Sequence, residues 1–144
     1  MKHINTKSID ETVRLGREFA ATLKGGEAVC LYGDLGAGKT VFVKGVIDYF
    51  IPGKRVLSPT FIIVRHYPTN NKTIKEIIHV DLYRLDTQKD IVSIGLRQFL
   101  HKPDSVVLIE WAQKLGVYLP QKRIDVKISH LGETVRSFEL KRYG

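Results

Sequence analysis

Short, almost continuously apolar runs alternate with amphipathic segments along the chain, and this order predicts a sheet of buried strands connected by helices. The runs at 27–32 and 105–110 have the composition of strands that are buried on both faces. Apolar residues recur at helical spacing over 9–23, 39–50 and 90–100. We therefore expect helices in these three ranges, with buried strands before the second and after the third.

Local signals indicate where the first two helices begin and end. Ser8 and Glu11 have the spacing of a capping box, which predicts that the first helix begins after Ser8. A glycine pair at 25–26 is expected to end this helix, and the Pro-Gly pair at 52–53 is expected to end the second. The apolar side of the first helix is predicted to comprise Ile9, Val13, Ala20 and Leu23.

Two further pairs of strands are predicted in the middle and at the end of the chain. The segments 61–67 and 74–85 are rich in β-branched and aromatic residues and flank a polar turn, which indicates a hairpin. The segments 124–128 and 135–140 are expected to pair antiparallel across a turn at Gly132. Together these elements predict an α/β fold with a mostly parallel central sheet, added antiparallel strands and helices on both faces.

Composition narrows the class of protein. The 144 residues fit a single domain spanning 1–144, and a hydrophobic content of 43% is too high for a disordered chain. The one cysteine, Cys30, excludes an intrachain disulfide and every zinc site that needs paired cysteines. No apolar stretch approaches the ~20 residues that a bilayer requires, and the N-terminus lacks an apolar signal core. We therefore expect a cytoplasmic protein that does not use a membrane.

The net charge suggests the kind of partner. Lys and Arg number 23 and Asp and Glu 15, so the formal charge is +8. A surplus of this size attracts phosphates, nucleic acid or acidic proteins, and it does not distinguish among them.

The segment from Gly33 to Thr40 matches the phosphate-binding pattern G-x-x-x-x-G-K-[ST]. Its glycines allow the backbone N–H groups to surround phosphate oxygens, and the helix that follows adds its positive N-terminal end. Lys39 supplies a charge for the β- and γ-phosphates, and the Thr40 hydroxyl can hold Mg²⁺. The predicted nucleotide-binding residues are Gly33, Asp34, Leu35, Gly36, Ala37, Gly38, Lys39 and Thr40.

Asp81 and Glu110 are the candidate acids for binding the metal ion and positioning the attacking water. Glu110 ends the most apolar predicted strand, which is the usual place for such an acid in P-loop enzymes, although a strand-end acid can also simply face water. Asp81 and His79 alternate with Val80 and Leu82, and by itself this alternation favours a solvated strand face.

The sequence also bears on the choice of base. GTPases read guanine with Asn-Lys-x-Asp, and the only Asn-Lys pair here, at 71–72, is followed by Thr and Ile. This argues for adenine or for no strong base preference.

Four motifs, in this order, resemble the TsaE family, the small bacterial ATPases of tRNA threonylcarbamoyladenosine biosynthesis. They are Leu-Gly-Ala-Gly-Lys-Thr at 35–40, Ser-Pro-Thr-Phe at 58–61, His-Val-Asp-Leu-Tyr-Arg at 79–84 and Ile-Glu-Trp at 109–111. The phosphate loop alone would indicate only the P-loop superfamily. Four ordered motifs in so short a chain are specific.

The resemblance implies a P-loop NTPase fold and a partner-dependent activity. A family member hydrolyses ATP to ADP and phosphate, with Mg²⁺, and works with two partner proteins, TsaB and TsaD. TsaD transfers the threonylcarbamoyl group to adenosine 37 of tRNA, and the TsaE member drives the complex between turnovers without performing that transfer. Contact with tRNA, direct or through the partners, is compatible with this role.

The same resemblance implies individual roles. Lys39 is expected to contact phosphate, Thr40 and Glu110 to bind Mg²⁺, and Asp81 to take part in hydrolysis. Thr60 matches a switch threonine placed to sense the γ-phosphate. Further candidates from the same motifs are His79, Tyr83, Arg84 and Trp111. For the tryptophan, packing in the core is an equally ordinary role.

Two other functions stay open at this point. A small-molecule kinase could use the same phosphate loop, although such kinases usually need a lid and an acceptor pocket for which this chain has little room. A basic tRNA-binding module could carry the loop incidentally, and the charge of +8 supports it. The basic residues are scattered, however, and no RNA-binding motif with interleaved aromatics is present.

Overall fold

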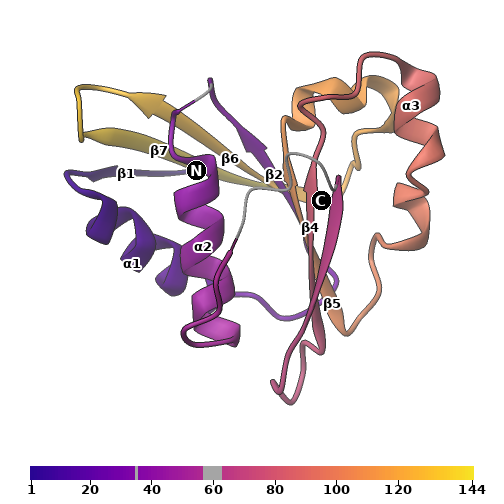
Figure 1. Ribbon diagram of the computed structural model, residues 1–144, viewed down its shortest axis with the longest axis horizontal. Coiled ribbons are helices and arrows are strands. Elements are labelled where there is room, and N and C mark those ends of the chain that lie inside the picture. Colours follow the sequence, from indigo (N-terminus) through magenta and orange to yellow (C-terminus); the bar gives the residue numbers. More distant parts are fainter. Residues whose placement is uncertain (35, 57–62) are drawn as a thin grey trace.

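The computed structural model describes residues 1–34, 36–56 and 63–144, and these form one seven-stranded sheet with helices packed on both faces (Figure 1). The strand order across the sheet is β1-β7-β6-β2-β5-β4-β3. The strands are β1 (Lys2–Thr6), β2 (Ala28–Tyr32), β3 (Val64–Pro68), β4 (Glu76–Asp81), β5 (Ser105–Glu110), β6 (Arg123–His130) and β7 (Arg136–Tyr143).

The centre of the sheet is parallel and its edges are antiparallel. Strand β2 lies between β5 and β6 and is parallel to both, and β4 is parallel to β5. Antiparallel pairing adds β3 beside β4 on one side, and β7 and β1 beyond β6 on the other. This arrangement confirms the predicted α/β sheet, including the antiparallel pair across Gly132.

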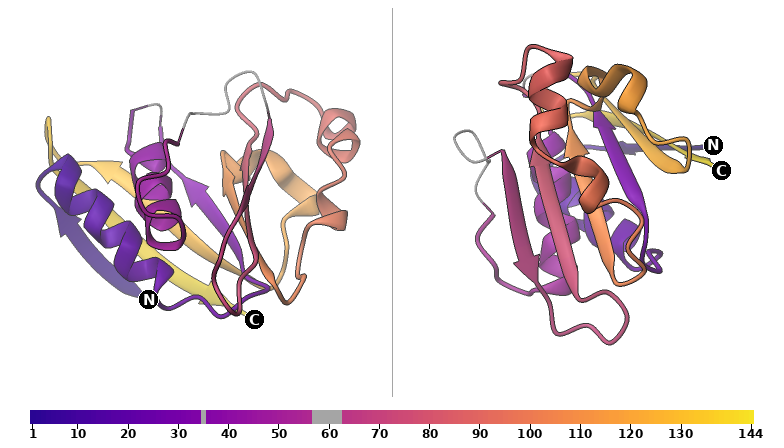
Figure 2. Two further views of the ribbon diagram at one scale, coloured as in Figure 1. Left: turned by 60° about the horizontal axis from the view of Figure 1, so that its bottom comes forward. Right: turned by 90° about the vertical axis from the view of Figure 1, so that its right-hand side faces the viewer.

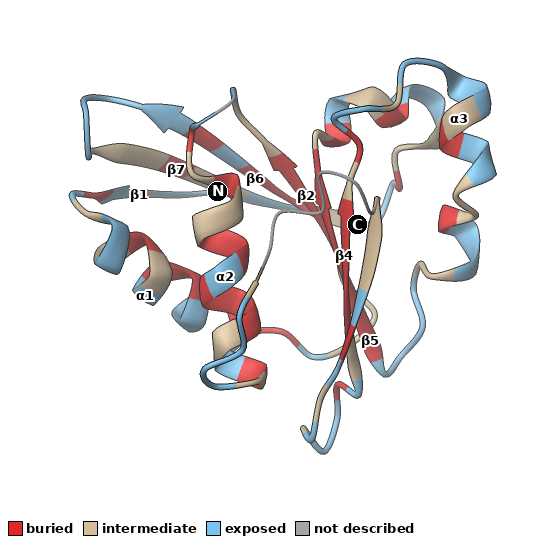
Figure 3. Cartoon of the chain, viewed as in Figure 1, coloured by how far each residue is buried: buried red, intermediate tan, exposed pale blue. Residues whose placement is uncertain are grey.

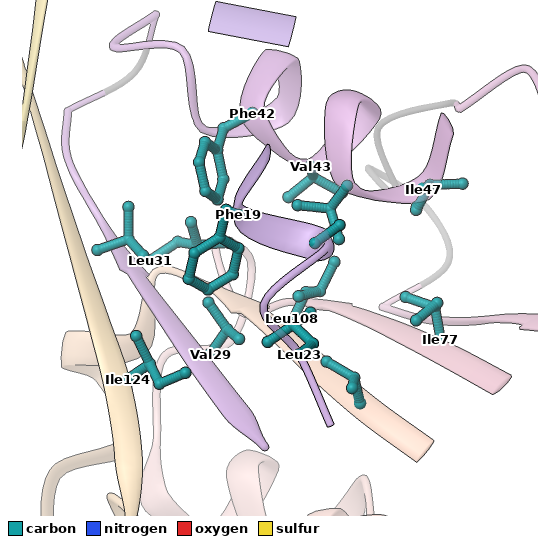
Figure 4. Packing of buried hydrophobic residues seen from close by; sticks show 14 of the residues in the cluster. Phe19, Leu23, Val29, Leu31, Phe42, Val43, Ile47, Ile77, Leu108 and Ile124 are labelled. Atoms are coloured by element: carbon teal, nitrogen blue, oxygen red, sulfur yellow. The ribbon is translucent and has the colours of Figure 1, made fainter. Parts of the chain in front are cut away.

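Helices cover the two faces of the sheet and enclose two separate cores (Figure 2). Helices α1 (Ile9–Ala20) and α2 (Lys39–Phe50) pack on one face, where Phe19 and Phe42 lie against β2 and β5 (Figure 4). Helix α3 (Gln88–Ser93) and the 3-10 helices η1 (Leu96–Gln98) and η2 (Ala112–Tyr118) pack on the other. The central strands between these layers are buried, as Figure 3 shows. No helix in the described ranges is long and apolar enough to cross a membrane.

Several predicted elements have different bounds in the structure. The helix predicted over 90–100 begins at Gln88, after a capping box formed by Thr87 and Asp90, and ends at Ser93. Gly95 follows in the left-handed region with φ 68°, so the chain continues only as the short η1. The strand predicted over 74–85 is limited to β4. The hairpin it forms with β3 is present, and the part of the predicted first strand at 61–62 lies outside the described residues.

The N-terminal region differs as well. Strand β1 was not predicted because its one apolar residue, Ile4, gives no periodic signal, and pairing with β7 holds it in the sheet. The first helix begins after Ser8, whose hydroxyl accepts a hydrogen bond from Glu11 N at 3.1 Å, but it ends at Ala20, before the glycine pair. The assignment of Ile9 to its apolar side is wrong, since this residue is 68% exposed.

Helices α1 and α2 cross where two glycines meet. A Cβ built on Gly16 would lie 2.4 Å from Phe42 O, and one built on Gly45 would lie 2.2 Å from Val13 O. Both contacts are with backbone atoms, which cannot rotate away. The helices therefore need glycine at this crossing in order to pack α2, and the phosphate loop that precedes it, close to the sheet.

Gly16→Ala is expected to lower the free energy of unfolding by about 1–3 kcal/mol, because the added methyl forces the two helix backbones apart. Gly132→Ala is the matched control, since a Cβ there meets only the Val135 side chain at 3.9 Å. Urea denaturation of the two variants and the parent protein measures the difference. Equal stabilities for Gly16→Ala and the parent would contradict the tight crossing.

Candidate functional site

The phosphate loop joins β2 to α2 and depends on its glycines for its shape. Gly33, Gly36 and Gly38 have φ values of 154°, 77° and 106°, conformations that other residues rarely adopt. A Cβ on Gly33 would also lie 2.7 Å from Ile128 O on β6, so the loop can start only from a glycine here. Gly38 caps α2, whose N-terminus faces the interior of the loop.

A cavity of about 400 Å³ lies beside the loop. Gly36, Gly38, Lys39 and Thr40 form one wall. The carboxyl ends of β4 and β5 form a second wall, and the start of α1 with the turn between β6 and β7 forms a third. In a parallel α/β sheet, ligands bind at the carboxyl ends of the strands, so the position of this cavity is the one expected for a binding site.

The Lys39 amine is buried at the back of this cavity, and only 5% of the residue is exposed. It donates hydrogen bonds to Gly33 O and to Asp34 O, the latter at 2.9 Å. The amine also lies 4.3 Å from the centre of the Trp111 ring. Burial lowers the pKa of Lys39, while the carboxylates of Glu110, Asp81 and Asp34 oppose that shift. The lysine therefore closes the loop on itself and holds a charge where phosphates would lie.

Glu110 is the buried acid of the site, with 2% of its surface exposed. Its Oε1 accepts a hydrogen bond from the Thr40 hydroxyl at 3.3 Å, and its Oε2 lies 2.5 Å from His79 Nε2. The simple alternative of a strand-end acid facing water is excluded by this burial. The solvated face that alternation favours is also wrong for His79, which is completely buried.

Asp81 ends β4 directly beside Glu110 in the parallel register. Its Oδ1 accepts a hydrogen bond from Tyr83 N at 3.0 Å. Burial raises the pKa of Asp81, and the neighbouring Glu110 carboxylate adds to the shift, whereas the Tyr83 amide, His79 and Lys39 lower it. The acid is half-buried at the wall of the cavity, where it can reach a molecule bound on the loop.

The aromatic and basic candidates of the motifs border the same cavity. Trp111 has φ 59°, a left-handed conformation that turns the chain immediately after Glu110 and brings the indole over the Lys39 amine. The Tyr83 ring lies 5.1 Å from the Trp111 ring, and Arg84 lines the opening. Trp111 is thus part of the site wall, rather than of the core alone.

Arg136 is a site residue that the sequence motifs did not indicate. It begins β7, and its guanidinium donates to Gly36 O at 3.5 Å and to Glu133 O at 3.1 Å. A Cβ on Gly38 would lie 3.7 Å from its Nε. A basic residue just after a turn carries no local signal, so only the antiparallel return of β7 brings this cation to the phosphate loop.

The described residues offer a partial binding site for a divalent cation. They contain no group of three or more His, Cys, Asp or Glu side chains that could hold a metal by themselves. The Thr40 hydroxyl and the Glu110 carboxylate are adjacent oxygen donors, which suits Mg²⁺, an ion that commonly takes one or two protein ligands together with substrate phosphates. The donors therefore fit a magnesium ion that arrives with a nucleotide.

Most of the predicted site residues come together in this one cavity. Lys39, Thr40, Asp81 and Glu110 do so from α2, β4 and β5. Thr60 and Leu35 lie outside the described residues, so their predicted roles stay predictions. The start of α1, including the exposed Ile9, also borders the cavity, which the sequence did not indicate.

The family model and the most similar relatives found by sequence comparison carry the same name. The sequence model of the family described as "Threonylcarbamoyl adenosine biosynthesis protein TsaE" matches residues 6–138. The chain is 37% identical to the tRNA threonylcarbamoyladenosine biosynthesis protein TsaE of Rickettsia bellii over 141 residues, which cover 94% of each chain. It is 33% identical to the protein of the same name from Bacillus subtilis, over 100% of this chain and 89% of that one.

A solved structure agrees with the sequence comparisons. The crystal structure of YdiB from Bacillus subtilis superposes with a TM-score of 0.80 at 30% sequence identity. The match covers 99% of this chain and 86% of that chain. The similarity therefore extends over the whole sheet and its helices.

Asp81→Asn is expected to raise the free energy of unfolding at pH 7 in the absence of nucleotide and metal. A carboxyl whose pKa is raised by folding binds a proton more readily in the native state, so its contribution to stability falls as the pH rises above its ordinary value of 3.8. Asparagine keeps the acceptor for Tyr83 N and removes the charge. The advantage of the variant should shrink as the pH is lowered and disappear below about 3.8.

Urea denaturation from pH 3 to pH 8, in EDTA, tests this expectation. Asp86→Asn, which neutralises an exposed acid on the loop after β4, is the matched control and should show no such trend. A variant at Asp81 that is less stable than the parent at pH 7 would contradict the burial argument.

Proposed function

The chain belongs to the TsaE family of tRNA threonylcarbamoyladenosine biosynthesis, and we propose that it serves this process as a magnesium-dependent ATPase. The observation that carries the proposal is the meeting of three groups in one cavity. A phosphate loop closed by Lys39, the Thr40–Glu110 pair and the half-buried Asp81 lie together there. These are the parts that P-loop enzymes use for phosphoryl transfer to water.

Each group has a distinct task in ATP hydrolysis. The backbone N–H groups of the loop and the Lys39 ammonium would bind and orient the β- and γ-phosphates. Thr40 and Glu110 would hold Mg²⁺, which supplies charge neutralisation on the phosphate oxygens during bond breaking. Asp81, fixed by the Tyr83 amide, would orient the attacking water and accept its proton. Positioning and electrostatic stabilisation of this kind account for most of the catalysis in phosphoryl transfer.

Arg136 adds a second cation to the loop, on the side away from Asp81. Because its guanidinium is held by carbonyls of the β6–β7 turn and by Gly36 O, it would stiffen the loop and face the nucleotide. We propose ATP rather than GTP as the substrate, since the guanine-reading motif is absent from the sequence.

The pathway named for the family supports a proposal for the partners. We propose that the chain works with TsaB and TsaD in the cytoplasm, where its ATPase drives the complex between turnovers while TsaD performs the transfer to adenosine 37 of tRNA. The second candidate function, a basic tRNA-binding module, is favoured by the charge of +8. Such a module would bind tRNA with a steep dependence on salt and without regard to ATP, which distinguishes it from the ATPase.

Lys39→Ala is expected to weaken the binding of Mg·ATP by tenfold or more, because it removes the buried charge of the phosphate cradle. Titration calorimetry measures the affinity. Lys127→Ala, which removes an equal charge from an exposed position on β6, is the matched control and should bind ATP normally. Parental affinity in the Lys39 variant would exclude the loop as the nucleotide site.

Glu110→Gln and Asp81→Asn are expected to reduce ATP turnover by about a hundredfold or more, equivalent to ~2–4 kcal/mol of barrier. Both variants keep the shape of the acids and one acceptor oxygen each, and they leave the phosphate loop unchanged, so ATP binding should survive at a measurable level. Phosphate release in the presence of TsaB and TsaD is the measurement. Turnover at the parental rate in both variants would show that these acids are not used.

A further inference from the structure

We infer that His79 is a positioning residue for the magnesium site, and that it directs one oxygen of Glu110 toward the metal by binding the other. The inference rests on the proposed function, since it concerns the same metal. It assigns a task to a completely buried residue that is not among those lining the cavity beside the phosphate loop.

The contact is buried on both sides. His79 has no exposed surface and Glu110 has 2%, and His79 Nε2 lies 2.5 Å from Glu110 Oε2. The histidine stands on β4 opposite Leu108 of β5, so it reaches diagonally along the sheet face to the residue two positions further on. The pair is thus fixed by the strand register and is not a chance meeting of flexible side chains.

The two oxygens of Glu110 have separate partners. A carboxylate offers only acceptors, so the hydrogen between the pair belongs to His79 Nε2, and Oε2 is occupied. Only Oε1 is left, and it faces the Thr40 hydroxyl at 3.3 Å. A metal ion that contacts Thr40 therefore meets Oε1 in a set orientation. Without the histidine, the carboxylate could rotate and would lose a hydrogen bond that compensates its buried charge.

The other nitrogen of the His79 ring makes no competing hydrogen bond among the described residues. This atom, Nδ1, is buried and has no partner there. Among the described residues, Glu110 is therefore the hydrogen-bond partner that orients the ring.

The test measures metal binding directly. Mn²⁺ replaces Mg²⁺ as the probe, and its affinity for the protein with ADP bound is followed by electron paramagnetic resonance. His79→Leu should weaken Mn²⁺ binding by about 10–100-fold, as is usual when a group that orients a metal ligand is lost. His79→Gln, whose amide can place a donor near the position of Nε2, should recover most of the affinity. Affinity for ADP in EDTA should be unchanged in both variants.

A second histidine–glutamate pair provides the matched control. His66 on β3 lies 2.9 Å from Glu76 on β4, but both side chains are exposed and distant from the phosphate loop. His66→Leu should leave Mn²⁺ affinity within about twofold of the parent protein. Thermal unfolding of every variant reports folding, and His79→Asn, whose amide is too short to reach Glu110, replaces the leucine variant if that one does not fold.

The outcomes separate the inference from the proposed function. Parental Mn²⁺ affinity in His79→Leu or His79→Asn would overturn the positioning role alone. Equal losses in the Leu and Gln variants, or a loss of ADP affinity in EDTA, would overturn it in favour of a general packing role. Failure of the parent protein to bind Mn²⁺ with ADP would overturn both the positioning role and the proposed ATPase.

Discussion

The structure of the site depends on one buried charge, the carboxylate of Glu110. Removing a carboxylate from water costs several kcal/mol unless hydrogen bonds and opposite charge compensate it. Here His79 Nε2 and the Thr40 hydroxyl bind its two oxygens, and the Lys39 ammonium lies in the same cavity. Each of these groups comes from an element packed against β5, so β4, β5 and α2 must keep their relative positions. The geometry of the site therefore depends on the packing of the sheet.

Two cations from different parts of the chain donate hydrogen bonds to carbonyls of the phosphate loop. Lys39 donates to carbonyls of the loop itself, and its ammonium group lies over the Trp111 ring. Arg136, from β7, donates to Gly36 O. A loop held in this way would lose little conformational freedom on binding a phosphate group. The left-handed conformation of Trp111 strains the backbone locally, and it places the indole next to the lysine.

Packing between helices α1 and α2, far from the cavity, also affects the geometry of the site. Helix α2 carries Lys39 and Thr40 at its start and is held against α1 by the contact of Gly16 and Gly45. Its first turn can lie over the ends of β4 and β5 only if the rest of the helix lies close to the sheet. A shift of this helix by a fraction of an ångström would change the Thr40–Glu110 distance directly.

The sequence by itself determined the order of elements, the parallel centre of the sheet and the phosphate loop, because these follow from local periodicity and from glycines that the backbone requires. It also placed Glu110 at the end of a strand, whereas Asp81 fell inside the predicted strand 74–85 and only the structure ends β4 at this residue. It did not determine β1, the break at Gly95, the burial of His79 or the presence of Arg136 in the site. Alternation along β4 suggests that His79 faces water, whereas the folded chain buries it completely. Arg136 is 96 residues from Thr40 along the chain, and long-range strand pairing alone brings it to the loop. Such contacts depend on which surfaces meet in the folded chain, and no local pattern records that.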